Sequence, residues 1–128
     1  RYRGSDPDIY LLSNFQGVGN LEVSAFQAAA DVVLQKSLRE GFGLTVTEAM
    51  WKGKPVVAGR VGGILLQVED GKNGFLVDSV EECAERVRQL MADPALRQRI
   101  GEKAHRKVLE NFLITRHLRD YLDLFSTL

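Results

Sequence analysis

The sequence has a single cysteine, only two histidines and three prolines, and no excess of charge of either sign. One cysteine, Cys83, excludes a disulfide within the chain, and its place at an apolar position of an expected helix indicates a buried thiol. We therefore expect a reducing, cytoplasmic environment. His105 and His117 are far apart and have no cysteine or carboxylate at metal-ligand spacing, so no metal site is expected.

The 17 basic and 17 acidic residues cancel, which argues against binding to nucleic acid or to an anionic membrane through the overall field. A charged partner would have to be bound locally. No apolar run approaches the roughly 20 residues that span a bilayer, and no signal-like start is present. The chain does not begin with methionine, and the start Arg1–Gly4 suggests a fragment or an excised domain.

Short apolar runs alternate with helical periods and turn residues over the first two thirds of the chain. We expect four strands, at residues 9–12, 31–35, 55–58 and 75–77. Helices are expected at residues 23–30 and 45–52, with a helical turn at residues 64–68. Strands joined by crossovers predict an α/β fold, a Rossmann-like open parallel sheet with flanking helices.

The last third of the chain is predicted to be helical. Ser79 and Glu82 have the spacing of a capping box, and Asp93 followed by Pro94 ends one helix and begins the next. Thr115 is expected to cap a final helix, whose apolar side chains are spaced to dock on the domain or on a partner: Leu118, Tyr121, Leu122 and Phe125. The interpretation is one domain over residues 1–128, with residues 79–128 as its helical tail.

Three familiar sites can be tested against the sequence, and none of them is favoured. Gly53–Lys54 resembles the end of a phosphate-binding P-loop, but the first glycine and the final hydroxyl residue of that motif are missing. Residues 41–46 begin like a dinucleotide fingerprint, but valine stands at the third glycine, which disfavours an NAD site. No serine or cysteine lies in a nucleophile elbow, so covalent hydrolysis has no visible carrier.

The stretch REGFGLTVTEAM, residues 39–50, places a glycine-rich turn between an expected strand and an expected helix. Ligands of open parallel sheets bind outside the carboxyl ends of strands, and free N–H groups at a helix start suit phosphate oxygens. Gly43 allows close approach of a ligand to the backbone, and Thr45 offers a hydroxyl. Because carboxylates repel phosphate, Glu40 and Glu48 should reach neutral hydroxyls on either side, as in a sugar nucleotide.

The same residues also allow readings without a ligand. Thr45 and Glu48 have the spacing of a capping box, which would satisfy the helix's own N–H groups. In a reading without a ligand, Glu40 is an exposed loop residue paired with Arg39, and Phe42 is a plug in the core.

The two glutamates stand in the context REGFGLTVTEAMWKGKPVVAG, with VGGI and DGKNGFLV further along the chain. This pattern resembles the carboxy-terminal, donor-nucleotide domain of retaining glycosyltransferases of family 4 with the GT-B fold, in particular the trehalose-forming members. The resemblance runs from about Asp6 to the end of the chain. It is specific over residues 31–78 and looser in the helical tail.

The resemblance implies that Glu40 contacts hydroxyls of the transferred sugar and stabilises the positive charge that develops on it. Glu48 would bind the ribose hydroxyls, and Asn14 would lie in the region that holds the base. The other implied donor-binding residues are Gly41, Phe42, Gly43, Leu44, Thr45 and Gly63. The implied reaction is transfer of glucose from ADP- or UDP-glucose to an acceptor with retention, without a cofactor or a protein nucleophile.

A GT-B enzyme has two Rossmann-like domains, and the amino-terminal, acceptor-binding domain of that arrangement is not found in this sequence. The first strands of the donor domain, with their diphosphate-binding arginine and lysine, are also expected to be missing. We therefore expect the isolated chain to be inactive and to bind its donor weakly, with exposed sheet edges that favour a homodimer. The alternative is a non-catalytic scaffold or oligomerisation module.

Overall fold

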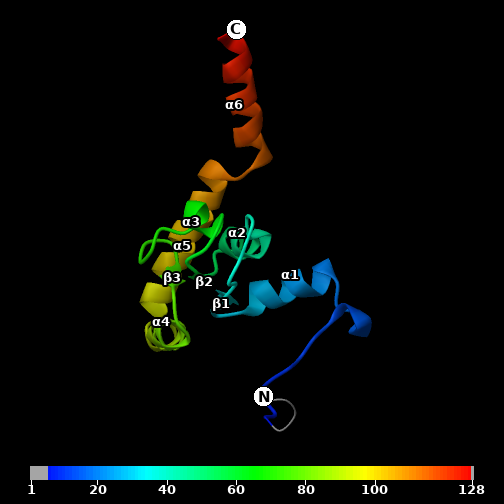
Figure 1. Ribbon diagram of the computed structural model, residues 1–128, viewed down its shortest axis with the longest axis vertical. Helices are drawn as coiled ribbons and strands as arrows, with labels where there is room; N and C mark the ends of the chain where they lie inside the picture. The colour runs from blue at the N-terminus through cyan, green and yellow to red at the C-terminus, as the bar shows by residue number, and fades with distance from the viewer. Residues whose placement is uncertain (1–5, 128) are drawn as a thin grey trace.

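A computed structural model describes residues 6–127, and Figure 1 shows a small parallel sheet with helices packed around it. In chain order the elements are η1 (Asn14–Gln16), α1 (Asn20–Ala29), β1 (Val33–Gln35), α2 (Leu44–Trp51), β2 (Val56–Gly59), α3 (Ile64–Gln67), β3 (Phe75–Val77), α4 (Val80–Ala92), α5 (Pro94–Asn111) and α6 (Ile114–Ser126).

The sheet has the strand order β1-β2-β3, and both pairings are parallel. Val33 lies opposite Val56 in the first pairing, and Val57 lies opposite Phe75 in the second. Helices connect these strands because the chain must cross back to the end of the sheet where the previous strand began before it can form a parallel neighbour. The predicted α/β fold with an open parallel sheet is therefore confirmed.

Successive residues of β2 point to opposite faces of the sheet, and each face has its own core. Val56 and Ala58 pack with Met50 of α2 and with Ile64 of α3. Val57 packs on the other face, in a cluster supplied by β3, α4 and α5: Phe75, Val77, Leu90, Leu96 and Ile100. Burial on both faces explains why β2 is an unbroken apolar run, as is typical of parallel sheets.

Three of the four predicted strands are present, and the strand predicted at residues 9–12 is wrong. This segment is neither helix nor strand, and its side chains from Ile9 to Leu12 are between 50% and 80% exposed. In Figure 1 the chain before α1 runs away from the sheet, whose strand order ends at β1. An apolar run becomes a strand only where a neighbouring strand pairs its backbone, and within residues 6–127 none does so here.

The predicted caps of the helical tail are confirmed at two of three helices. The Ser79 side chain accepts from the Glu82 N–H at 3.0 Å, although the Glu82 carboxylate reaches back to the Asp78 N–H and not to Ser79. Asp93 caps α5 by accepting from the Leu96 N–H at 2.9 Å, with Pro94 in the first turn. Cys83 is half-buried and packs against the cluster around Val57, so the predicted burial is only partial.

The predicted cap of the last helix is wrong, and so is the first of the two docking alternatives, docking on the domain itself. Leu113 is the residue before the first turn of α6, and Thr115 lies inside the helix. None of the described residues of α6 is buried, and Figure 1 shows the helix projecting away from the rest of the domain. Within residues 6–127 the apolar side chains of α6 do not dock on the sheet or on its covering helices.

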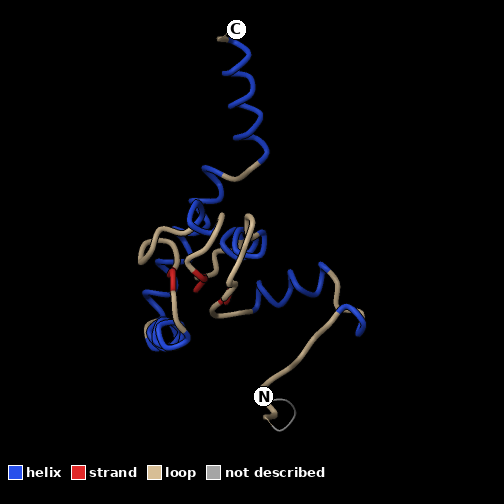
Figure 2. The backbone as a smooth tube through the Cα atoms, viewed as in Figure 1, coloured by secondary structure: helices blue, strands red, loops and turns tan. Residues whose placement is uncertain are grey.

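Figure 2 shows that loops join each strand to the following helix. The loop after β1 carries Glu40, Gly41, Phe42 and Gly43, and the loop after β2 carries Gly63. Among the helices that the structure describes, none is long and apolar enough to cross a bilayer. Over the same residues, histidine, cysteine and carboxylate side chains do not gather in a group that could hold a metal ion.

Candidate functional site

The loop between β1 and α2 ends in a tight turn at Gly43, whose φ of +88° places it in the left-handed region that glycine adopts at no steric cost. Helix α2 begins directly afterwards, at Leu44. Within residues 6–127 the backbone N–H groups of residues 42–45 have no hydrogen-bond acceptor, whereas the Val46 N–H already bonds to the Gly43 carbonyl at 3.0 Å. This run of free donors, with the positive end of the helix dipole behind it, suits an anion.

Glu40 lies half-buried just before this turn, and three donors orient its carboxylate. Gln35 Nε2 and Ser37 Oγ each donate to Glu40 Oε2 at 3.3 Å, and the Gly41 N–H donates to Oε1 at 3.0 Å. None of these donors is Arg39, so the alternative of a Glu40–Arg39 pair is wrong. An ionised carboxylate has lone pairs to spare after three bonds, so Glu40 can still accept from a hydroxyl.

The loop after β2 packs against the Glu40–Phe42 segment backbone to backbone. The Gly63 N–H donates to the Gly41 carbonyl at 2.7 Å. A Cβ at Gly63 would lie 2.4 Å from the Gly41 oxygen and 2.7 Å from the Phe42 Cα, distances that real Cβ atoms do not adopt. The absence of a side chain at Gly63 therefore allows the two loops to meet, and the structure brings Gly63 beside the glycine-rich turn.

A fully buried glutamine of α3 holds the turn from beneath. The Gln67 amide nitrogen donates to the Phe42 carbonyl, and its Oε1 accepts from Thr47 Oγ1 at 2.8 Å. The buried side chain of Asn73 extends this network by donating to the Gln67 carbonyl at 3.0 Å. A buried amide is costly unless it is bonded, and here both ends of the Gln67 amide are used to fix α3, α2 and the turn together.

Glu48 lies on the exposed side of α2, one turn beyond the free N–H groups. The helix begins at Leu44 after Gly43, and no side chain caps it, so the alternative of a Thr45–Glu48 capping box is wrong. Instead, Glu48 Oε2 accepts from the Gln27 amide of α1 at 3.3 Å. The carboxylate is therefore not consumed by the backbone of its own helix.

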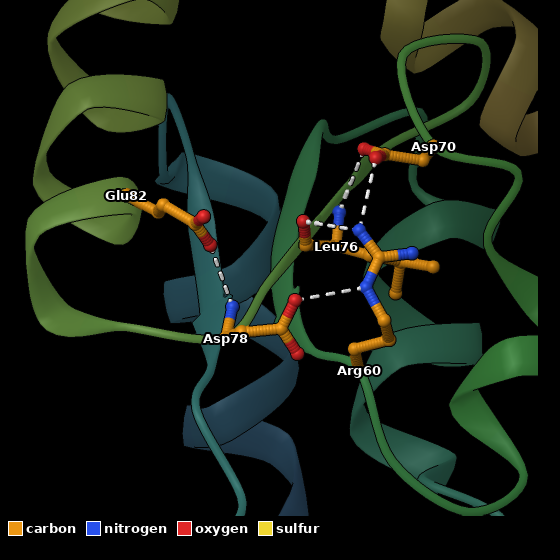
Figure 3. Close-up of polar contacts among 5 residues, drawn as sticks. All are labelled: Arg60, Asp70, Leu76, Asp78 and Glu82. Atoms are coloured by element: carbon orange, nitrogen blue, oxygen red, sulfur yellow. Dashed lines mark hydrogen bonds and ion pairs between the residues drawn. The ribbon is translucent and has the colours of Figure 1, made fainter.

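An arginine clamp holds the start of the loop after β2 (Figure 3). Arg60 Nε pairs with Asp78 at 3.1 Å, and Arg60 Nη2 pairs with Asp70 at 3.1 Å and also donates to the Leu76 carbonyl at 3.3 Å. The hydrogen bond to Asp78, followed by that to Asp70, raises the pKa of Arg60 above its ordinary value. The clamp ties the ends of β2 and β3 together just before Gly62 and Gly63, the loop that supports the turn.

Two of the predicted site residues need a separate description. Asn14 lies in η1, on the exposed segment that precedes α1, and Figure 1 shows this segment leading away from the sheet. The structure therefore does not bring Asn14 together with the turn. Phe42 is 38% exposed and packs edge to face against Phe112 with ring centroids 5.7 Å apart, so it is not a buried core plug.

Sequence reasoning missed the two buried glutamines, Gln27 and Gln67, that support the site. Each is a polar residue within a helix, and spacing alone gives no sign of what its amide would contact. The available signal for such a contact was a glutamine at a helix position that faces the core. Buried polar side chains are hydrogen-bonded, so a glutamine there indicates a bond to another element.

The chain matches the family model of the glycosyl transferases group 1 over residues 11–107. It is 52% identical to the trehalose synthase of Pyrococcus horikoshii over 98% of its own length and 30% of that protein. It is also 52% identical to the trehalose synthase of Rubrobacter xylanophilus over 99% of its own length and 30% of the relative. The chain thus spans about 30% of the length of these curated relatives.

Solved structures with the same fold include glycosyltransferases. HepE of Anabaena, in complex with UDP-glucose, matches 84% of this chain and 30% of its own with a TM-score of 0.74 and 31% identity. The C-terminal domain of LpcC, a group 1 glycosyl transferase of Francisella tularensis, matches 83% of this chain and 53% of its own with a TM-score of 0.71 and 29% identity.

Proposed function

The chain belongs to the group 1 glycosyl transferases, and from this premise we propose that it forms the sugar-nucleotide-binding half of a retaining glycosyltransferase. The proposed reaction moves glucose from ADP-glucose or UDP-glucose to an acceptor, which is glucose itself in trehalose synthesis. The glucose C1–oxygen bond to the diphosphate breaks, a bond to the acceptor oxygen forms on the same face, and the nucleoside diphosphate leaves, with its departing oxygen taking the proton of the acceptor hydroxyl. The trehalose synthases and the UDP-glucose complex of HepE support this reaction class.

The observation that carries the proposal is the run of free N–H groups at residues 42–45, with a carboxylate on each side of it. A diphosphate is a natural guest because backbone donors and the helix dipole attract its oxygens, and Gly43 leaves room for close approach. Phe42, Gly43 and Leu44 would contact the diphosphate and the sugar, with Thr45 at the phosphate end.

The two carboxylates then have different roles. Glu40, oriented by its three donors, would accept from hydroxyls of the transferred glucose and stabilise the positive charge that develops at its anomeric carbon. Glu48, exposed and one turn along α2, would accept from the ribose hydroxyls. Gly41 and Gly63 would line the donor site, and Asn14 would reach the base only if the segment before α1 folds back. The acceptor would be held by another domain of the full-length enzyme.

The proposal is tested by titrating ADP and UDP into the chain and following the amide chemical shifts of residues 42–45, which report even weak binding. We expect saturable shifts, and Glu48→Ala should weaken the affinity at least roughly tenfold because hydrogen bonds to a charged group are lost. Glu102→Ala is the matched control, because Glu102 is an exposed helical glutamate that also accepts from a glutamine, Gln98, at 2.9 Å.

The competing function is a non-catalytic scaffold, in which the fold is kept for packing alone. Under that alternative neither nucleotide shifts the amides of residues 42–45, and Glu48→Ala behaves like Glu102→Ala. Equal affinity of the two variants would also refute the role of Glu48.

A further inference from the structure

Helix α1 has one buried residue, and that residue is a glutamine. Gln27 is only 5% exposed, whereas its apolar neighbours Leu21, Val23 and Phe26 are between 40% and 79% exposed. A buried amide is costly unless its polar atoms are hydrogen-bonded. A helix that buries an amide and leaves a leucine and a phenylalanine exposed therefore packs through the hydrogen bonds of that amide. The contacts of Gln27 show which groups these bonds reach.

Both ends of the Gln27 amide are bonded, one to α2 and the other to Lys52, the residue that directly follows α2. Lys52 Nζ donates to Gln27 Oε1 at 2.8 Å. Gln27 Nε2 donates to Glu48 Oε2 at 3.3 Å and to the Thr45 carbonyl at 3.5 Å. One side chain therefore joins a cation at the end of α2 to a carboxylate in its middle and to a carbonyl in its first turn.

The partners leave one orientation for this amide. An ammonium group only donates, so Lys52 requires the carbonyl oxygen of Gln27, and a carboxylate only accepts, so Glu48 requires the NH2 group. Turning the amide over would place two donors together at Lys52 and two acceptors together at Glu48. Lys52, whose ammonium also donates to the Glu48 carbonyl at 3.4 Å, thus directs the Gln27 N–H groups toward Glu48.

We infer that Gln27 is a positioning residue for nucleotide binding, which holds one oxygen of the Glu48 carboxylate and leaves the other free for the ribose. This inference rests on the proposed function. Glu48 is exposed on α2, so its side chain would sample several rotamers without Gln27. Binding of the ribose would then restrict it to one rotamer, at a cost in conformational entropy. Fixing the carboxylate beforehand lowers the entropic cost of the complex, which is the general effect of preorganisation.

The role is tested by a double-mutant cycle on ADP and UDP affinity with Gln27→Met, Glu48→Ala and the double variant. Methionine keeps the length of the side chain and removes both polar ends. We expect Gln27→Met to weaken binding about three- to tenfold in the wild type, as the loss of one side-chain hydrogen bond does, and to have no further effect when Glu48 is already alanine. Gln98→Met is the matched control and should leave the affinity unchanged.

A second measurement does not depend on nucleotide or on the stability of Gln27→Met. The side-chain amide resonances of Gln27 should shift in Glu48→Ala and in Lys52→Met, and should not shift in Glu102→Ala. Lys52→Met should also weaken nucleotide binding, because the amide is then free to turn over.

The outcomes separate the two proposals. If the wild type binds nucleotide and Gln27→Met binds equally well, or if the effect persists in full in the Glu48→Ala background, the positioning role is overturned and the function stands. If the Gln27 amide responds to Glu48→Ala but the wild type binds neither nucleotide, the contact is real and the proposed function is overturned.

Discussion

The contact between Gly63 and the glycine-rich turn leads to a sharp prediction for Gly63→Ala. The φ of Gly63 is −66°, which alanine adopts readily, so the backbone conformation itself is no obstacle. The obstacle is the new methyl group, which would lie 2.4 Å from the Gly41 oxygen and 2.7 Å from the Phe42 Cα. Both of those atoms belong to the backbone and cannot turn aside as a flexible side chain would.

The magnitude follows from two losses. Forcing the loops apart costs about 1–3 kcal/mol as overpacking, and breaking the 2.7 Å bond from the Gly63 N–H to the Gly41 carbonyl adds about 1 kcal/mol. We therefore expect the free energy of unfolding to fall by about 2–4 kcal/mol. With a urea dependence of roughly 2 kcal/mol per molar, the denaturation midpoint should fall by about 1–2 M.

The control is Gly41→Ala, in the loop on the other side of the same contact. A Cβ at Gly41 meets no atom within 4 Å, so this variant should change the free energy of unfolding by less than about 0.5 kcal/mol. Urea denaturation followed by circular dichroism measures both. Equal midpoints for the two variants would refute the claim that the loops are held together by this close approach.

Two further predictions concern the helices that support the site. Asp93→Ala should lower the free energy of unfolding by about 1 kcal/mol in urea denaturation, because α5 loses the carboxylate that accepts from the Leu96 N–H, and an unchanged midpoint would contradict this. The hydrogen bond from Lys107, followed by that from Lys72, lowers the pKa of Glu69 in the folded state. This interaction therefore stabilises the folded state fully at pH values above the ordinary pKa of 4.5, and the stabilisation is lost as the pH falls through the lower folded pKa. Carboxyl chemical shifts should therefore show Glu69 titrating below its ordinary range in the wild type and closer to it in Lys107→Met, and identical curves would exclude this cause.

Predictions from the sequence were most accurate where local signals decide the structure. Asp93 followed by Pro94 marks the boundary between α4 and α5 because a side chain and an imino acid act within one turn. The helix predicted at residues 45–52 is α2 (Leu44–Trp51), correct to within one residue at each end, and the left-handed Gly43 makes the turn that precedes it.

The errors occurred where a partner distant in sequence decides the structure. The apolar run at residues 9–12 has the composition of a strand, but a strand needs a paired neighbour, and within residues 6–127 this segment has none. Thr45 and Glu48 have the spacing of a capping box, but α2 begins at Leu44 with Gly43 as its N-cap, so Thr45 already lies inside the helix. Glu48 therefore lies beyond the first turn, where it meets Gln27 of another helix.

The sequence by itself determined the α/β class, two of the helix caps and the stretch at residues 39–50 as the candidate site, because hydrophobic period, turn residues and caps act over a few residues. Only the tertiary structure decided how that site is held. Gly63 meets Gly41, Gln67 bonds to Phe42 and Gln27 bonds to Glu48, each across more than twenty positions of the chain. Such contacts depend on where the sheet places each element. The burial of a glutamine amide, or of the backbone at a glycine, has no local signature in the sequence.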